Sequence, residues 1–157
     1  IEKMLRSPKL FFLDTGLVNF RVGFKEFFTD RGSLDQIYQG RIAEQVVAQE
    51  IVSYSSQKPR LNFWIKEKGE AEIDFLYPCK DLLIPIEVKS GTLGKLKSLF
   101  LFMERSEHPY ALRVYSGENR IDEIRLPSGK VFYLQSLPFY FLPRLDDVLA
   151  RLISKYK

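Results

Sequence analysis

The sequence predicts an α/β fold in which one mixed β-sheet is flanked by helices. Two observations predict it. Apolar residues recur with the period of a helix over two long stretches. Between and after these stretches they recur with the two-residue period of a strand. Turn residues such as Gly, Pro and Asp separate these stretches at short intervals. The expected elements, in chain order, are a helix over 35–53, strands over 61–65, 71–77 and 82–89, a helix over 95–107, a strand over 111–115, a hairpin over 120–134 and a helix over 145–156.

Composition narrows the class of protein. The 157 residues fit one domain, and a hydrophobic content of 45% with an aromatic content of 14% excludes a disordered chain. No apolar run approaches the ~20 residues of a membrane span. The single cysteine, Cys79, excludes an internal disulfide framework and predicts a reducing, cytoplasmic compartment. The net charge of +4 is compatible with an anionic partner.

The first part of the chain, residues 1–34, is predicted to be a connecting segment packed on a domain of residues 35–157. The chain begins Ile-Glu-Lys rather than with Met, so we expect a fragment of a longer protein. The sequence Lys-Leu-Phe-Phe-Leu over 9–13 predicts a short strand, and the turn residues 14–16 could cap the segment that follows. The apolar stretch 17–28 predicts one or two short helical turns.

The stretch from Glu72 to Lys89 predicts a hairpin that brings charged residues together. A short turn over 78–81 joins its two strands. Because strand side chains alternate between faces, Glu72 and Asp74 share one face of the first strand. By the same rule, Glu87 and Lys89 share one face of the second strand. The opposite face of the first strand should carry the apolar residues Ala71, Ile73, Phe75 and Tyr77.

These carboxylates predict a site for a divalent cation. Burial of an unpaired charge costs several kcal/mol, so carboxylates on apolar strands need a partner. Asp74 and Glu87 are predicted to hold Mg²⁺ or Mn²⁺, which prefer oxygen ligands. Lys89 could then contact an attacking water or a phosphate. Glu72 is expected to take less part, because it lies about 7 Å further along the strand than Asp74.

Glu44 has two interpretations. On a helical wheel it lies within the apolar stripe of the first long helix, which is formed by Ile37, Gly40, Val47, Ala48 and Ile51. Glu44 could extend to water or pair with Arg41. Alternatively, it could point from the helix at the same site as the strand carboxylates and add a metal ligand. The carboxylates downstream favour the second interpretation.

Together, Glu44, Asp74 and the sequence Glu87-Val88-Lys89 resemble the PD-(D/E)xK nuclease superfamily, which includes many restriction enzymes and Holliday-junction resolvases. The resemblance implies a mixed sheet flanked by helices. It also implies that Asp74, Glu87 and Glu44 bind the metal ion, and that Lys89 stabilises charge during phosphodiester hydrolysis. The sequence departs from the motif in one place, because an isoleucine rather than a proline precedes Asp74.

A second resemblance extends over nearly the whole chain. Six segments are similar to the C-terminal domain of unknown function in a large family of prokaryotic AAA-type ATPases: 7–17, 40–50, 63–65, 71–75, 84–91 and 137–140. In that family the domain follows a P-loop ATPase module, which the resemblance therefore implies as a partner. The chain itself has no Walker A or Walker B motif, so it should not bind ATP.

Two functions are compatible with these residues. The first is Mg²⁺-dependent hydrolysis of DNA by an endonuclease-like domain. The alternative is a non-catalytic regulatory module that docks DNA or a protein for the ATPase. Five basic residues could line a nucleic-acid path around the site, or could belong to an ordinary solvated surface: Arg60, Lys66, Lys68, Lys95 and Lys97.

Overall fold

A computed structural model of the chain describes residues 9–21, 36–54, 61–66, 71–91 and 95–156. The helices and strands expected after residue 35 are present, with shifts of a few residues at their ends. The described elements are α1 (Thr15–Arg21), α2 (Gln36–Tyr54), β1 (Asn62–Ile65), β2 (Glu72–Cys79), β3 (Leu82–Val88), α3 (Lys97–Arg105), β4 (Tyr110–Tyr115), β5 (Arg120–Arg125), β6 (Val131–Pro138), the 3₁₀ helix η2 (Phe139–Arg144) and α4 (Leu145–Lys155).

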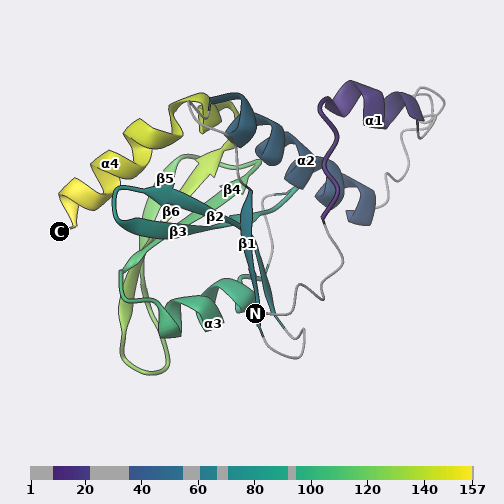
Figure 1. Cartoon of the computed structure of the whole chain (residues 1–157). Coiled ribbons are helices and arrows are strands. Elements are labelled where there is room, and N and C mark those ends of the chain that lie inside the picture. The colour runs from purple at the N-terminus through teal and green to yellow at the C-terminus, as the bar shows by residue number, and fades with distance from the viewer. Residues whose placement is uncertain (1–8, 22–35, 55–60, 67–70, 92–94, 157) are drawn as a thin grey trace, which may run out of the picture.

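The described strands form one six-stranded mixed sheet in the order β1-β2-β3-β4-β6-β5 (Figure 1). The pairs β1/β2, β2/β3 and β5/β6 are antiparallel, whereas β3/β4 and β4/β6 are parallel. The parallel pair β3/β4 needs a crossover, and α3 supplies it. The predicted mixed α/β fold is therefore confirmed.

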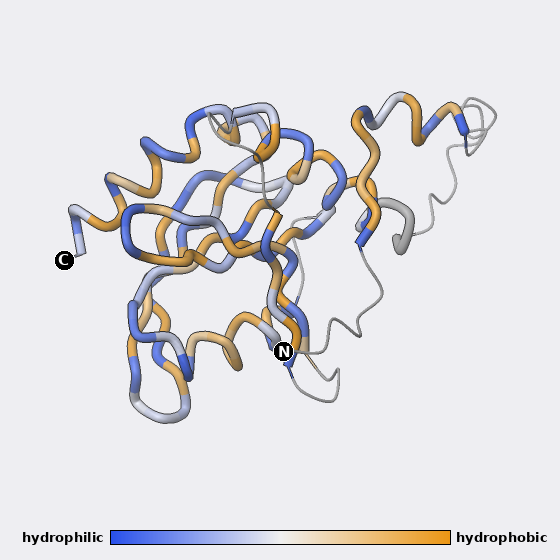
Figure 2. The backbone as a smooth tube through the Cα atoms, in the orientation of Figure 1, coloured by the Kyte–Doolittle hydropathy of each residue, from blue (hydrophilic) through white to orange (hydrophobic). Residues whose placement is uncertain are grey.

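Helices cover both faces of the sheet. In Figure 1, α2 and α4 lie on one side and α3 lies on the other. The core on the α2 and α4 side includes Val47, Ile84, Leu112 and Leu149. The core on the α3 side includes Leu99, Met103, Ala111, Phe132 and Leu134. Figure 2 shows hydrophobic and hydrophilic residues alternating along α4, which buries one face only. Within the described residues, every helix falls short of the length or apolarity that a membrane span requires.

The strand predicted over 9–13 is absent. Residues 9–14, which we call the strap, have no regular secondary structure. The side chain of Gln45 on α2 forms two hydrogen bonds with the strap backbone. The N–H of Phe12 donates to Oε1 of Gln45 (2.9 Å), and the Gln45 amide donates to the Phe12 carbonyl. Because α2 rather than a sheet edge bonds this backbone, no strand forms there. The predicted helix cap is confirmed, since the N–H of Leu17 donates to Oδ1 of Asp14 (3.0 Å).

The hairpin predicted between β2 and β3 is confirmed, but its turn is tighter than expected. Cys79 pairs with Leu82, so the ladder continues through residues that were expected to form the turn. The connection consists of Lys80 and Asp81, and Lys80 has a left-handed φ of 55°. A left-handed residue is common in two-residue hairpin turns.

Strand β2 contains an irregularity that the sequence analysis missed. Asn62 of β1 lies opposite Leu76, but Trp64 lies opposite Ile73. Between these two pairs, β2 advances by three residues while β1 advances by two. This extra residue is a β-bulge, and it reverses the alternation of side chains. Ile73 packs in the core on the α3 side, whereas Phe75 packs in the core on the α2 side. The prediction that these two residues share a face is therefore wrong.

Candidate functional site

The bulge places Asp74 at the point where β2 and β3 separate. The described register of the two strands extends from Cys79 opposite Leu82 to Phe75 opposite Ile86. Beyond that pair, Oδ2 of Asp74 accepts a hydrogen bond from the N–H of Val88 (2.8 Å). A side-chain oxygen thus takes the place of a backbone acceptor in the ladder. Bulges often re-aim a side chain beside a functional site, and this one turns Asp74 toward the end of β3.

Glu87 lies on β3 and is only 6% exposed. Its Oε1 accepts a hydrogen bond from Nζ of Lys89 (2.7 Å). Its Oε2 is also buried and has no hydrogen-bond partner among the described residues. Burial, followed by the negative charge of Asp74, raises the pKa of Glu87 to about 7, although Lys89 acts in the opposite direction. A buried carboxylate in this state needs a further cation or a proton.

Lys89 follows β3 directly and is held at both ends. Its backbone N–H donates to the carbonyl of Val114 on β4 (2.8 Å), and its ammonium contacts Glu87. The side chain is 25% exposed, so the ammonium is fixed by Glu87 but can still be reached from solvent. The predicted proximity of Glu87 and Lys89 is thus present in the structure.

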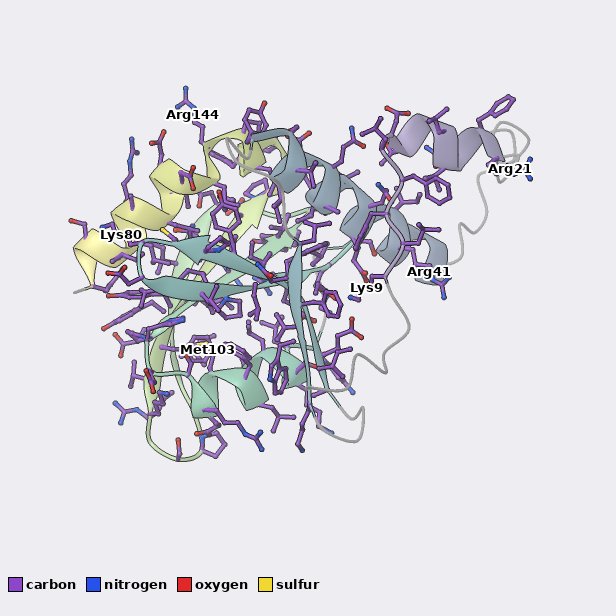
Figure 3. The ribbon with its side chains drawn as sticks, in the orientation of Figure 1. Lys9, Arg21, Arg41, Lys80, Met103 and Arg144 are labelled. Atoms are coloured by element: carbon purple, nitrogen blue, oxygen red, sulfur yellow. The ribbon has the colours of Figure 1, made fainter. Side chains whose placement is uncertain are left out.

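Glu44 faces the strand carboxylates from α2. Burial raises the pKa of Glu44, and the negative charges of Asp74 and Glu72 raise it further. This coupling puts Glu44 within electrostatic reach of the strands. No ion pair joins Glu44 to Arg41 in the described part of the chain, and Arg41 is exposed and points away from the sheet in Figure 3. The geometry thus favours the interpretation that directs Glu44 at the shared site.

The sequence analysis missed Lys9, which belongs to this cluster. Figure 3 shows Lys9 on the segment that runs beside α2. Its Nζ forms an ion pair with Glu72 and lies 4.0 Å from Oε2 of Glu44. It also lies 5.5 Å from the ring centroid of Phe63 on β1. No local pattern marks Lys9, because its partners lie on elements far along the chain. Glu72, which was expected to take less part, enters the cluster through this ion pair.

The charges of the cluster suit a divalent cation. Four carboxylates and two ammonium groups meet here: Glu44, Glu72, Asp74 and Glu87, with Lys9 and Lys89. When all are ionised, two negative charges remain uncompensated. An all-oxygen donor set with a buried, unpartnered Oε2 fits Mg²⁺ or Mn²⁺. As the side chains lie, however, no three His, Cys, Asp or Glu groups of the described residues converge closely enough to hold a metal ion.

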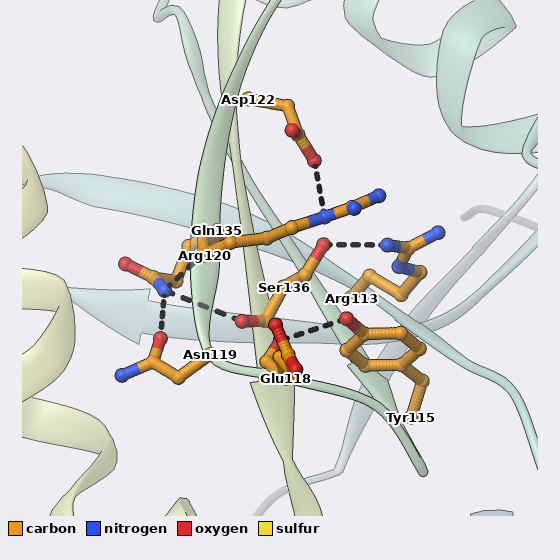
Figure 4. Close-up of polar contacts among 8 residues, drawn as sticks. All are labelled: Arg113, Tyr115, Glu118, Asn119, Arg120, Asp122, Gln135 and Ser136. Carbon is orange, nitrogen blue, oxygen red and sulfur yellow. Dashed lines mark hydrogen bonds and ion pairs between the residues drawn. The ribbon is translucent and has the colours of Figure 1, made fainter. Parts of the chain in front are cut away.

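A second polar row crosses the sheet from Glu87 and was also missed. Glu87 lies opposite Arg113 on β4, which lies opposite Ser136 on β6, which lies opposite Arg120 on β5. Directly opposite residues share a face, so these side chains form one row. In Figure 4 the Arg113 guanidinium donates to Oγ of Ser136 (2.8 Å) and stacks 4.2 Å from the ring centroid of Tyr115.

Arg113 is the unusual member of this row. It is only 8% exposed, and its Nε has no hydrogen-bond partner among the described residues. No carboxylate pairs with it in the part of the chain that the structure describes. The sequence signal was a single arginine in the otherwise apolar strand Tyr-Ala-Leu-Arg-Val-Tyr. Burying an arginine without an ion-pair partner is costly, which makes Arg113 unusual among the described residues.

The basic residues expected to line a nucleic-acid path are only partly described. Arg60 and Lys68 lie outside the described residues. Lys95 and Lys97 are exposed at the start of α3, and Lys66 is half-buried where β1 ends. Their role in binding DNA stays a prediction.

A surface cavity of about 450 Å³ lies elsewhere, between α4 and β5. Arg120, Arg151 and Tyr156 are among its lining residues, and none of the four predicted site residues lines it. Chemistry rather than shape therefore identifies the candidate site, because the buried unpartnered carboxylate lies in the cluster at β2 and β3.

The comparison with known families places this chain. The family model described as Domain of unknown function (DUF4143) matches residues 39–138, which are 100 of the 157 residues. The chain belongs to the DUF4143 family. The match extends from α2 to β6, so the DUF4143 region includes Glu44, Asp74, Glu87 and Lys89 but not the strap. No curated protein and no solved structure matches the chain. The prediction of a domain of unknown function is confirmed.

Proposed function

We propose that this DUF4143 domain is a metal-dependent endonuclease that hydrolyses phosphodiester bonds in DNA. One observation carries the proposal. Glu87 is 6% exposed with an unpartnered Oε2, and it lies beside Asp74 with the Lys89 ammonium 2.7 Å from its other oxygen. Two carboxylates and an ammonium held together in this way can bind a divalent cation and stabilise charge on a phosphoryl oxygen, which is the chemistry of metal-dependent phosphodiester hydrolysis.

The architecture supports a PD-(D/E)xK-like fold for the domain. The sheet is mixed, helices cover both faces, and the acidic residues lie where β2 and β3 separate. The helix that contributes Glu44 packs on the same sheet. This combination agrees with the resemblance of the sequence to that superfamily.

Each residue has a role in the proposed reaction. Asp74 and Glu87 would hold the cation, with Glu44 completing the shell from α2. When bound, Mg²⁺ or Mn²⁺ lowers the pKa of a water and stabilises charge on phosphoryl oxygens. Lys89 favours the ionised form of Glu87 and can donate a hydrogen bond to the attacking water or to the phosphate. Glu87 in turn fixes the ammonium, so that Lys89 is oriented before the substrate arrives.

The proposed substrate is DNA, bound chiefly through its phosphates. Contacts from exposed lysines such as Lys95 and Lys97 would give affinity without reading sequence. From the resemblance to the C-terminal domains of AAA-type ATPases, we propose that the domain acts beside an ATPase module of the same protein.

One observation favours the alternative, a non-catalytic module that docks DNA or a protein. Lys9 and Lys89 already compensate two of the four carboxylates, and no three carboxylates converge in the described residues. If this arrangement is permanent, the cluster is structural and the domain only binds.

A plasmid-nicking assay separates the two functions. Supercoiled and branched DNA would be incubated with the protein in Mg²⁺, Mn²⁺ or EDTA. Cleavage is expected with the metals only, and Asp74→Asn, Glu87→Gln and Lys89→Met should each lower the rate at least about 100-fold. Asp147→Asn and Lys155→Met are matched controls, because both residues are exposed on α4. Cleavage that persists in the site variants would contradict the assignment, and binding without cleavage would favour the docking module.

A further inference from the structure

The position of Lys9 has a consequence for the proposed metal site. Its ammonium stands between carboxylates of two different elements, Glu72 on β2 and Glu44 on α2. It also acts electrostatically on Asp74. Lys9 is thus one of the two lysine cations of this cluster, and it lies beside Glu44, which is one of the proposed metal ligands.

The strap delivers Lys9 to this position. Gln45 of α2 bonds both the N–H and the carbonyl of Phe12, and Oε1 of Gln49 accepts from the N–H of Thr15 (3.2 Å). The ring of Phe11 lies 5.7 Å from the ring of Phe75 in the core. These contacts aim Lys9 at the carboxylates, but they come from a few side chains rather than from a strand ladder.

The strap is held loosely enough to be displaced. A cavity of about 440 Å³ lies between the strap and α2, lined by Phe11 and Phe12 on one side and by Ala48 and Val52 on the other. The flanking strap residues Leu10 and Leu13 are 79% and 85% exposed. A segment with few buried contacts and no ladder lies at the low end of local stability, so the strap is expected to open before the sheet does.

Lys9 and a divalent cation would compete for Glu44, because the Lys9 ammonium lies 4.0 Å from Oε2 of this proposed metal ligand. With Lys9 and Lys89 in place, two negative charges of the four carboxylates remain uncompensated, whereas a divalent ion in place of Lys9 would leave one and would bind oxygen atoms directly. An ammonium and a divalent ion beside the same carboxylate would also repel each other.

We propose that Lys9 is a built-in counter-cation, and that the strap is a removable plug that must release Lys9 before a divalent cation binds. The inference rests on the proposed metal site. The apparent affinity for metal is then the intrinsic affinity multiplied by the fraction of molecules in which the strap is open. Anything that lifts the strap, such as a partner that binds its exposed apolar residues, would activate the site.

Calorimetric titration with Mn²⁺ tests the plug without relying on activity. Lys9→Met keeps the length of the side chain and removes its charge, so Mn²⁺ should bind about tenfold more tightly than to the wild-type chain. Lys9→Arg keeps the charge and should bind like the wild type. Lys155→Met, on α4, is the matched control and should leave the affinity unchanged.

A second variant loosens the strap without changing any charge of the cluster. Gln45→Ala removes both bonds to Phe12 and should tighten Mn²⁺ binding about threefold. Hydrogen exchange reports the motion directly, since the Phe12 amide should exchange faster when Mn²⁺ is added to the wild-type chain.

The outcomes separate the plug from the metal site. Equal affinities for the wild type, Lys9→Met and Gln45→Ala would overturn the plug and leave the metal site standing. Weaker binding by Lys9→Met would overturn it too. If Mn²⁺ binds none of these proteins, the proposed metal site fails, and the plug with it.

Discussion

At position 87, a carboxylate is buried with one oxygen bonded to Lys89 and the other without a partner. Burial and the charge of Asp74 raise the pKa of Glu87 to about 7. Without a metal ion, the folded chain binds a proton at Glu87 more tightly than the unfolded chain does. This residue therefore links protonation to stability as well as to the proposed function.

Protonation of Glu87 stabilises the folded chain, so this contribution to stability decreases as the pH rises. The stabilising contribution of protonated Glu87 is complete below its ordinary pKa of 4.5 and is lost as the pH rises through about 7. In EDTA, the free energy of unfolding of the wild type relative to Glu87→Gln should therefore fall by on the order of 1–3 kcal/mol between about pH 4.5 and pH 8. Urea unfolding at several pH values measures this difference. If the free energies of unfolding of the two proteins change with pH in the same way, the raised pKa of Glu87 is contradicted.

Two variants of Asp74 separate the effect of its negative charge on stability from the effect of its hydrogen bond to Val88. Asp74→Asn keeps an oxygen for the N–H of Val88 but removes a negative charge that burial disfavours. In EDTA at about pH 8 it should be at least as stable as the wild type. Asp74→Ala leaves the Val88 N–H without its acceptor and should be about 1–3 kcal/mol less stable than Asp74→Asn. Equal thermal midpoints for the two variants would show that this hydrogen bond does not support the bulge.

Local periodicity predicted some site residues and not others. The helical wheel selected Glu44, and strand alternation selected Asp74, Glu87 and Lys89; the structure brings these four near one another. Lys9 was missed, because its contacts depend on how the strap lies on α2 and β2, which no local pattern encodes.

At the scale of elements, the largest difference from prediction is the bulge in β2. Neither Gly nor Pro occurs at Asp74 or Phe75 to mark it, so alternation was expected to continue. The bulge arises from pairing with β1, and it is seen in the register of the two strands and in the opposite faces of Ile73 and Phe75. It matters because the strand separation at Asp74 lets a carboxylate, rather than a backbone carbonyl, accept the Val88 N–H.

Helix α4 shows how much of the fold lies outside the family match, which ends at residue 138. Its buried residues are Leu145, Leu149, Leu152 and Ile153. Leu149→Ala, at a side chain with no exposure, should cost about 2–5 kcal/mol of unfolding free energy. Ser154→Ala on the exposed face should change it by less than about 0.5 kcal/mol. Urea unfolding measures both, and similar values would mean that α4 does not pack on the core.

At the scale of the whole molecule, four separate segments build the candidate site: the strap, α2, β2 and β3. The order of helices and strands after residue 35 was predictable, because most of them carry a helical or strand period of apolar residues. The polar row that includes Glu87 and Arg113 was not predictable, because it depends on the order of strands in the sheet. The sheet therefore fixes the geometry of the site, and the strap controls access to it in the proposed account.

The central claim is that Asp74 and Glu87 bind a divalent cation. A crystal soaked in Mn²⁺ and measured for anomalous scattering tests this claim most directly. The account predicts a peak within about 2–2.6 Å of carboxylate oxygens from both residues, with the Lys9 ammonium displaced from Glu44 and Glu72. A saturated crystal with no peak there, and with Lys9 and Lys89 still paired to the carboxylates, would contradict it.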